Sequence, residues 1–252
     1  MRIRVLGCSG GSAPGREPSC YLLERGVAVD AGALATALSL EEQQEVRHVF
    51  LTHAHWDHVR DLPLHTINRT PELAPLVVHG LSETIDDIRT HLMNDRVWFA
   101  AFDLPSPQAP YIASEEICAG ETVVCMGYKV SAVAMQHTVP AIGYLFDDGD
   151  RAVMLCADTL GNGFAERIPT DGSPLRAIFL EASFPNRMRD FAQMTGHLTP
   201  EMLGEQVACL DEDVQVLVTH MKPGFENELI AELADLGRAN VRAVRDGDVI
   251  HV

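Results

Sequence analysis

The stretch that decides the fold is Val49-Phe-Leu-Thr-His-Ala-His-Trp-Asp-His58. It continues an apolar, strand-like run that starts at residue 48. Because residues 53 and 55 are two apart, an extended chain points both side chains to the same face. The turn that follows brings the next two ligands to a neighbouring position. Imidazole and carboxylate suit zinc, iron or manganese better than calcium or magnesium. One metal ion cannot easily use so many close ligands with good geometry, so the stretch predicts two ions side by side, held by His53, His55, Asp57 and His58.

Length and composition are those of one globular domain. The chain has 252 residues, of which 46% are hydrophobic and 22% charged, and we interpret residues 1–252 as a single domain. The formal net charge is −17. So acidic a surface repels nucleic acid, and it argues against a large RNA or DNA partner. A small anionic substrate stays compatible with this charge, because bound metal ions dominate their local field.

Targeting signals and cysteine spacing favour a cytoplasmic protein. No stretch approaches the roughly 18 apolar residues of a membrane span, so we expect no membrane partner. The first residues read as a strand and lack the apolar core of a signal peptide. The six cysteines show no CxxC spacing and mostly lie in apolar runs, which is typical of reduced, packed thiols.

The order of the elements predicts two sheets packed together with helices outside, a four-layer αββα sandwich of the α/β (α+β) class. Strands come first, helices are interleaved later, and the chain falls into comparable halves near residue 127. An aromatic, proline-rich insert at about 94–114 interrupts the pattern, and we expect it to cover a site or an interface. Helices are expected at Ala33–Val46, His58–Arg69, Ser82–Met93, Thr199–Leu210 and Phe225–Leu236, and a last strand pair at Arg242–Val252. Ser82 and Thr199 are expected to be the cap residues of their helices.

Three further strands each end in one residue able to bind a metal. Apolar runs lead into His137, Asp158 and His220. One such ending is commonplace, but three of them together with the opening stretch are a strong signal for a metal centre. Asp30 follows a predicted hairpin, where it is either an ordinary turn residue or a carboxylate that holds a ligand histidine.

The HxHxDH motif, followed by a lone His, Asp and His at strand ends, resembles the metallo-β-lactamase fold superfamily over essentially the whole chain. The resemblance implies a ligand set. His53, His55 and His137 would hold one metal ion, and Asp57, His58 and His220 the other, with Asp158 bridging. It also gives Asp57 a catalytic role. The cofactor would be two divalent ions, with zinc favoured and manganese or iron as alternatives.

Two later segments resemble the class II cyclic-nucleotide phosphodiesterases within that superfamily. These are Phe179-Leu-Glu-Ala-Ser-Phe-Pro185 and Gly196-His-Leu-Thr-Pro200. Ribonuclease Z has a similar pair of segments. Both families would place His197 near the scissile phosphate as a catalytic and substrate-binding group. We further expect Thr199 to bind substrate, and Glu181 to orient residues of the site without binding the metal itself.

The resemblance implies a dinuclear phosphodiesterase that hydrolyses 3′,5′-cyclic nucleotides to 5′-monophosphates. Two cations sharing a water lower its pKa toward about 7, which supplies hydroxide for in-line attack on phosphorus. His197 would bind the phosphate or protonate the leaving oxygen. The expected partner is a small anionic phosphodiester.

Three other functions stay open at this point. They are ribonuclease Z action on tRNA, which needs a basic extension that the chain lacks, hydrolysis of a lactone or thioester, and metal binding without turnover. The preferred nucleobase stays open, as does assembly into a homodimer.

Overall fold

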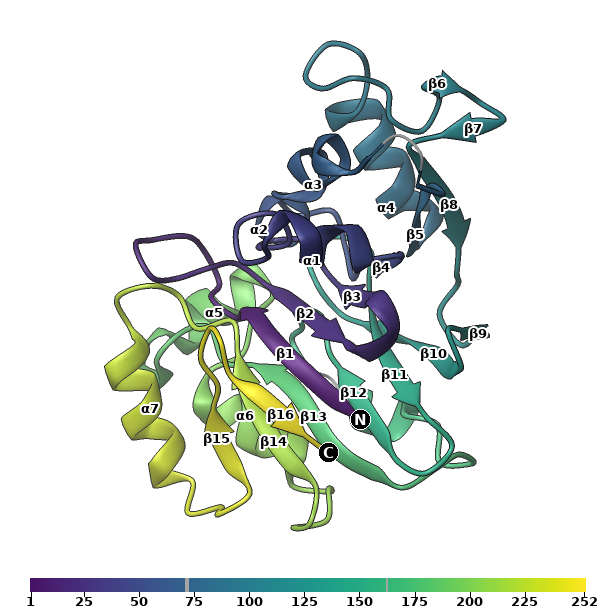
Figure 1. Cartoon of the computed structure of the whole chain (residues 1–252). Helices are drawn as coiled ribbons and strands as arrows, with labels where there is room; N and C mark the ends of the chain where they lie inside the picture. Colours follow the sequence, from purple (N-terminus) through teal and green to yellow (C-terminus); the bar gives the residue numbers. More distant parts are fainter. Residues whose placement is uncertain (71–72, 162) are drawn as a thin grey trace.

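The computed structural model describes residues 1–70, 73–161 and 163–252. Within these residues two large sheets pack face to face, and helices cover their outer faces (Figure 1). The four-layer αββα sandwich expected from the sequence is therefore confirmed. The ends of the chain lie side by side, since the Met1 amino group donates a hydrogen bond to the Val252 carbonyl at 3.2 Å.

The first sheet contains the motif strand and takes most of its strands from the N-terminal half. Its order is β16-β1-β2-β3-β4-β5-β8. Pairing is antiparallel from β16 to β3 and parallel from β3 to β8. The strands span Val249–His251 (β16), Arg2–Gly7 (β1), Cys20–Leu23 (β2), Val27–Val29 (β3), His48–Phe50 (β4), Leu76–Gly80 (β5) and Ile112–Glu116 (β8).

The second sheet takes its strands from residue 122 onward, in the order β15-β14-β13-β12-β11-β10-β9. Its strands β12 to β15 are parallel, so their carboxyl ends share one edge. They span Val241–Ala243 (β15), Gln215–Thr219 (β14), Leu175–Glu181 (β13), Ala152–Leu155 (β12), Ala141–Asp147 (β11), Tyr128–Met135 (β10) and Thr122–Cys125 (β9).

Three apolar clusters separate the four layers. The central one joins both sheets through side chains such as Phe50 and Tyr144. One outer cluster lies under the N-terminal helices and the other under the C-terminal helices. The helices span Leu40–Glu45 (α1), Trp56–Val59 (α2), Leu62–Asn68 (α3), Ser82–Asp87 (α4), Arg189–Thr195 (α5), Pro200–Val207 (α6) and Glu226–Asp235 (α7), with short helical turns at Glu24–Gly26 (η1), Ile88–Leu92 (η2), Phe164–Arg167 (η3) and Asn186–Met188 (η4).

Three helix predictions were wrong in their bounds. The helix expected from residue 33 begins only at Leu40, because Ser39 forms a capping box with Glu42 and so fixes the start there. The helix expected after the motif is two short ones, α2 and α3, separated by two residues. In the third, Ser82 is the first helical residue and not the cap, which is Leu81, and after Asp87 the helix widens into the π-helical turn η2.

The last strand pair was also predicted wrongly. Strands β15 and β16 do not pair with each other: β15 joins β14 in the second sheet, and β16 joins β1 in the first. The turn at residues 246–247 therefore crosses from one sheet to the other. Local sequence cannot distinguish such a crossing from a hairpin, because both are two short strands around a turn.

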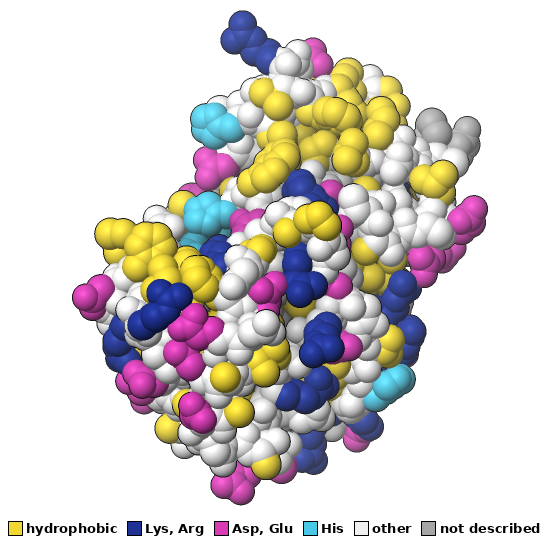
Figure 2. Space-filling model, turned by 90° about the vertical axis from the view of Figure 1, so that its left-hand side faces the viewer, with side chains coloured by type: hydrophobic (Ala, Val, Ile, Leu, Met, Phe, Trp, Pro, Cys, Tyr) yellow, Lys and Arg dark blue, Asp and Glu magenta, His cyan; other side chains and the backbone are white. Residues whose placement is uncertain are grey.

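The insert at 94–114 carries a small hairpin, β6 (Pro105–Ser106) and β7 (Ala109–Pro110), that projects from one end of the molecule (Figure 1). Its last residues belong to β8. Hydrophobic side chains gather at this end in Figure 2. Ile67 and Val97, which line one surface pocket with Phe99, are both exposed. The homodimer stays a prediction. No helix within the described ranges is long and apolar enough to cross a membrane.

One hydrogen bond ties the second sheet to the chain just before the motif. The buried Tyr144 hydroxyl donates to the carbonyl of Leu51 at 2.7 Å. We predict that Tyr144→Phe lowers the free energy of unfolding by about 1 kcal/mol, the usual worth of such a bond. Urea denaturation measures this. The control is Tyr111→Phe, a half-buried ring whose hydroxyl makes no hydrogen bond that the described part of the chain records. Equal stability of both variants would contradict the assignment.

Candidate metal centre

The opening motif lies where the chain leaves β4 and enters α2. His53 and His55 are in the extended segment between these elements, and Asp57 and His58 are in the helix itself. The two rings of His53 and His55 lie 4.6 Å apart, centroid to centroid. His53 and His58 are buried, whereas His55 and Asp57 are partly exposed. The turn therefore separates the ligands into two adjacent groups, as the spacing predicts.

The three remote residues converge on the same place from the second sheet. His137 follows β10, Asp158 follows β12 and His220 follows β14. Nε2 of His137 lies 3.2 Å from Nδ1 of His55. Nε2 of His220 lies 3.3 Å from Nε2 of His58 and 3.3 Å from Oδ2 of Asp57. The site therefore spans the edge where the two sheets meet.

Asp158 lies between the two groups of ligands. Its carboxylate oxygens are 3.4 Å from Nε2 of His58 and 3.3 Å from Nε2 of His220 on one side. On the other side they are 3.8 Å from His53 and 3.9 Å from His137. Ligand atoms within 4.8 Å of one another form one group of His53, His55, His137 and Asp158, a second of Asp57, His58 and His220, and a third in which His197 lies with Asp158 and His220. The structure thus brings all seven predicted ligands together in the predicted division.

In three of the histidines, the ring nitrogen that points away from the centre contacts a protein group. The other ring nitrogen therefore faces the centre. Nδ1 of His58 donates to Oδ2 of Asp30 at 2.7 Å. Nδ1 of His137 donates to the carbonyl of Gly196 at 2.9 Å. Nδ1 of His220 lies 3.0 Å from the Ser183 hydroxyl. Such partners fix the tautomer and orientation of metal-ligating histidines.

His53 tests whether the site fits a metal ion. Its Nε2 is buried and has no hydrogen-bond partner among the described residues. Burial, with help from the neighbouring His58, lowers the pKa of His53 well below its ordinary value, so the ring is neutral. Nδ1 lies 3.0 Å from the hydroxyl of Thr52, which itself donates to Asp30. The lone pair of Nε2 therefore points unpaired into a set of nitrogen and oxygen donors, which fits a divalent cation.

Two residues of the site have a strained backbone. Asp30 and His220 both have a φ of 57°, a conformation that residues other than glycine rarely adopt. Gly196 has a φ of 79° at the end of α5. A Cβ there would lie 2.7 Å from Nδ1 of His137. Glycine is required at this position because its carbonyl must approach the His137 ring closely.

A buried ion pair flanks the metal ligands. Nδ1 of His197 lies 2.9 Å from Oε1 of Glu181. Burial lowers the pKa of His197, but the Glu181 carboxylate outweighs it and the pKa is raised. Burial in turn raises the pKa of Glu181, and His197 outweighs it so that the pKa is lowered. Glu181 also accepts a hydrogen bond from the Ser183 hydroxyl, the partner of His220. One carboxylate thus supports both histidines.

Two further residues, Thr199 and Lys222, lie close to this ion pair in the sequence or in space. Thr199 is fully buried, and its hydroxyl accepts a hydrogen bond from the Met202 amide as the N-cap of α6, the capping role that the sequence predicts. Substrate binding by Thr199 stays a prediction. Sequence reasoning missed Lys222, whose charge reaches His197 and whose ammonium lies 6.0 Å from the Phe184 ring. Its position two residues after His220 is the signal that could have found it.

The chain belongs to the β-lactamase superfamily: the family model described as "Beta-lactamase superfamily domain" matches residues 27–221. Among solved structures, the metallo-β-lactamase fold protein YhfI from Bacillus subtilis has a TM-score of 0.79 at 17% identity and covers 99% of both chains. Unliganded yeast PDE1 also has a TM-score of 0.79, at 19% identity, covering 100% of this chain and 99% of its own. These likenesses define a metallo-β-lactamase fold.

The curated relatives are of two kinds. The Yersinia pestis protein named "Probable 3′,5′-cyclic-nucleotide phosphodiesterase" is 25% identical over 210 residues, 73% of this chain and 59% of its own length. Ribonuclease Z of Pyrococcus abyssi is 31% identical over 109 residues, 42% of this chain and 33% of its own. The matches thus span between a third and three fifths of these relatives.

The Asp30 carboxylate is expected to strengthen metal binding through His58. We predict that Asp30→Asn weakens binding of divalent metal by roughly 10- to 100-fold, the usual effect of losing such a partner. Competition with a chromogenic chelator measures it. The control is Asp213→Asn, a surface aspartate paired with Arg176, which should leave the affinity unchanged. A wild-type affinity in Asp30→Asn would show that the carboxylate does not act on the metal.

Proposed function

We propose that the chain is a dinuclear metal-dependent phosphodiesterase that hydrolyses 3′,5′-cyclic nucleotides to 5′-monophosphates. The ligands we propose are the two groups described above, bridged by Asp158, with zinc as the favoured metal. Both the matched phosphodiesterase and the matched ribonucleases have names that denote phosphodiester chemistry. That common chemistry supports the reaction class, and features of this chain support the smaller substrate.

The observation that carries the proposal is the Glu181–His197 pair. His197 uses Nδ1 for Glu181, so Nε2 is the nitrogen left for substrate. The raised pKa favours a protonated ring near neutral pH, and Oδ2 of Asp158 lies 3.9 Å from Nδ1 of the ring. A cationic donor beside the metal ligands suits a phosphate anion. Hydrolysis of a lactone or another acyl substrate develops charge on one oxyanion and involves no phosphate, so it gains less from a cationic donor at this position.

An apolar pocket beside His55 provides room for the rest of a small substrate. The pocket has a volume of about 440 Å³ and is lined by His55, Trp56, Val97 and Val139 among others. This is within the usual range for small-molecule sites, which are largely apolar with a few polar groups. The indole of Trp56 is 59% exposed, and an exposed aromatic ring there offers a face on which a nucleobase can stack. The pocket supports a nucleotide substrate without selecting a base.

The proposed mechanism divides the work between the metal ions and the side chains. Bound divalent ions supply Lewis acidity and a water whose pKa is lowered toward about 7. His197 binds a phosphate oxygen and gives its proton to the leaving 3′ oxygen, and Glu181 keeps the ring charged and oriented. Lys222 adds positive charge on the same side, and Asp57 positions His220 through their 3.3 Å contact. His197 and Glu181 are both buried, so bulk water is excluded from their ion pair.

Ribonuclease Z action is the second candidate, because three of the curated relatives carry that name. The net charge of −17 opposes it, since tRNA binding depends on neutralising phosphates with basic side chains. A panel separates the functions. Metal-loaded protein should hydrolyse cyclic AMP or cyclic GMP and bis-nitrophenyl phosphate, and leave a precursor tRNA and a lactone intact. Cleavage of the precursor tRNA alone would establish the second candidate instead.

His197 is predicted to act in turnover and not in metal binding. We expect His197→Ala to bind the same number of metal ions as wild type and to lose about 10²- to 10⁴-fold in kcat, the usual contribution of a general acid. Metal content by mass spectrometry and kcat on cyclic AMP, whose 3′ oxygen needs a proton to leave, are measured on the same preparation. The control is His251→Ala, an exposed histidine on β16. Loss of a metal ion in His197→Ala would overturn the assigned role.

A further inference from the structure

A second cluster of metal-binding side chains lies outside the centre described above. Its members are His48, His79 and Cys125, each of which offers a ligand atom within 4.8 Å of the others. None of them belongs to the seven proposed ligands. His48 precedes His53 by five residues along a nearly extended segment, so the two sites are about 16 Å apart if the chain runs straight. The cluster therefore needs an explanation of its own.

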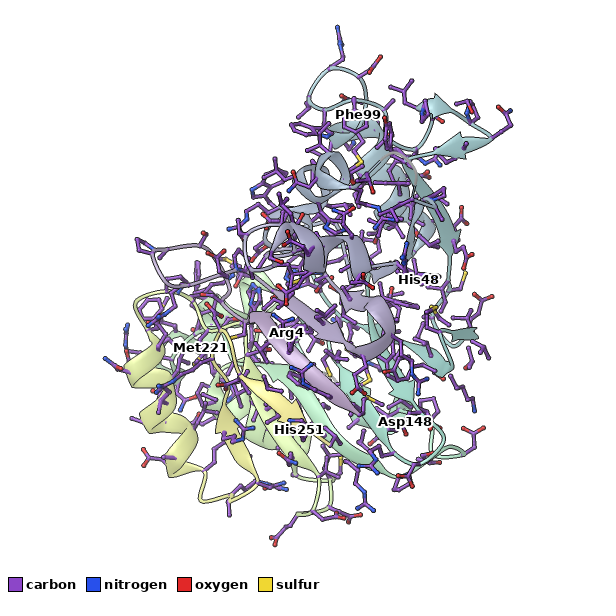
Figure 3. All side chains as sticks on the ribbon, in the orientation of Figure 1. Arg4, His48, Phe99, Asp148, Met221 and His251 are labelled. Atoms are coloured by element: carbon purple, nitrogen blue, oxygen red, sulfur yellow. The ribbon has the colours of Figure 1, made fainter. Side chains whose placement is uncertain are left out.

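The cluster joins the two sheets at one edge of the sandwich. His48 is on β4 and shares a face with Phe50, which belongs to the core between the sheets. His79 on β5 pairs with Phe50 and stacks on its ring at 4.1 Å. Cys125 comes from β9, the edge strand of the second sheet, and is buried in the same core. Figure 3 shows His48 on the side of β8 and β9, and Met221, next to His220, on the opposite side of that view.

The two histidines face each other as paired metal ligands do. Nδ1 of His48 lies 3.0 Å from Nε2 of His79, close to the 3.2 and 3.3 Å between facing nitrogens at the candidate metal centre. The other nitrogen of His79 lies 3.4 Å from a carboxylate oxygen of Glu115, its neighbour in register on β8. A carboxylate behind a histidine is the usual support of a ligating imidazole.

We propose that His48, Cys125 and His79 form a third, structural zinc site, distinct from the dinuclear centre. Two imidazoles and one thiolate are a ligand set that zinc binds tetrahedrally, and a water completes the four. Binding converts the Cys125 thiol to a thiolate, and its proton leaves to solvent. The ion would fasten the edge strand β9 to β4, the strand that leads directly into the HxHxDH motif.

The charge states of the free site agree with this geometry. Burial lowers the pKa of His48, and burial together with His48 lowers the pKa of His79 to about 4, so both rings are neutral at neutral pH. Burial raises the pKa of Cys125 to about 11, so the thiol keeps its proton until a metal displaces it. Binding should consequently weaken as the pH falls, because the metal must compete with that proton.

Cobalt(II) substitution tests the site separately from the dinuclear centre. The seven ligands of that centre are nitrogen and oxygen donors, so a thiolate-to-cobalt charge-transfer band in the near ultraviolet would come only from a site with a cysteine. We expect wild-type protein titrated with cobalt(II) to show this band and to bind one more ion per chain than Cys125→Ser. His48→Gln, a change at a half-buried position, should also lose the band.

The controls make the outcome decisive. Cys118→Ser, at an exposed cysteine, should keep the band and the full metal content. Phosphodiesterase turnover is not needed as a readout, so failure of the proposed function would leave this test intact. A wild-type spectrum without the thiolate band, or a band that survives in Cys125→Ser, would overturn the proposal and leave the cluster as a hydrogen-bonded histidine pair beside a buried thiol.

Discussion

The interaction on which the rest of the structure depends is the buried carboxylate of Asp158 among imidazoles from both sheets. An ionised carboxylate that is removed from water costs several kcal/mol unless charges or hydrogen bonds compensate it. Here burial raises the pKa of Asp158, but His220 and His58 outweigh it and hold the pKa well below its ordinary value. The carboxylate stays charged only while the surrounding rings keep their places. This requirement explains why several of those rings contact a protein group through the nitrogen that faces away from the centre.

The supporting contacts come from distant parts of the chain. Asp30 ends a hairpin in the first sheet, and Ser183 and Gly196 lie in the second half, yet each holds one ligand ring. The ligands themselves sit where strands end, because an edge of the sandwich is where side chains of both sheets can meet. Strained backbone at Asp30 and His220 is tolerated because several contacts fix each residue. A rigid scaffold thus presents polar groups that would otherwise repel one another or lack partners.

Much of this could be predicted from the sequence, because ligand spacing and strand ends are local features. The HxHxDH spacing predicts two ligand groups, and apolar runs ending in His137, Asp158 and His220 predict the strand ends. The alternation of strands and helices predicts the layers. The late start of α1 could have been predicted, because the Ser39–Glu42 capping box is a local signal, and the Thr199 cap of α6 is local too and was predicted. Local sequence failed where the outcome depends on distant partners, as at the crossing between β15 and β16. The His48–Cys125 cluster was invisible for the same reason, since β9 joins it from the other sheet.

The most direct test of the account is the position of metal ions in crystals of zinc-loaded protein, located by anomalous X-ray scattering at the zinc edge. The account predicts two strong peaks, one on each side of the Asp158 carboxylate, the first surrounded by His53, His55 and His137 and the second by Asp57, His58 and His220. A single peak shared by both groups, or no peak within bonding distance of Asp158, would contradict the dinuclear centre.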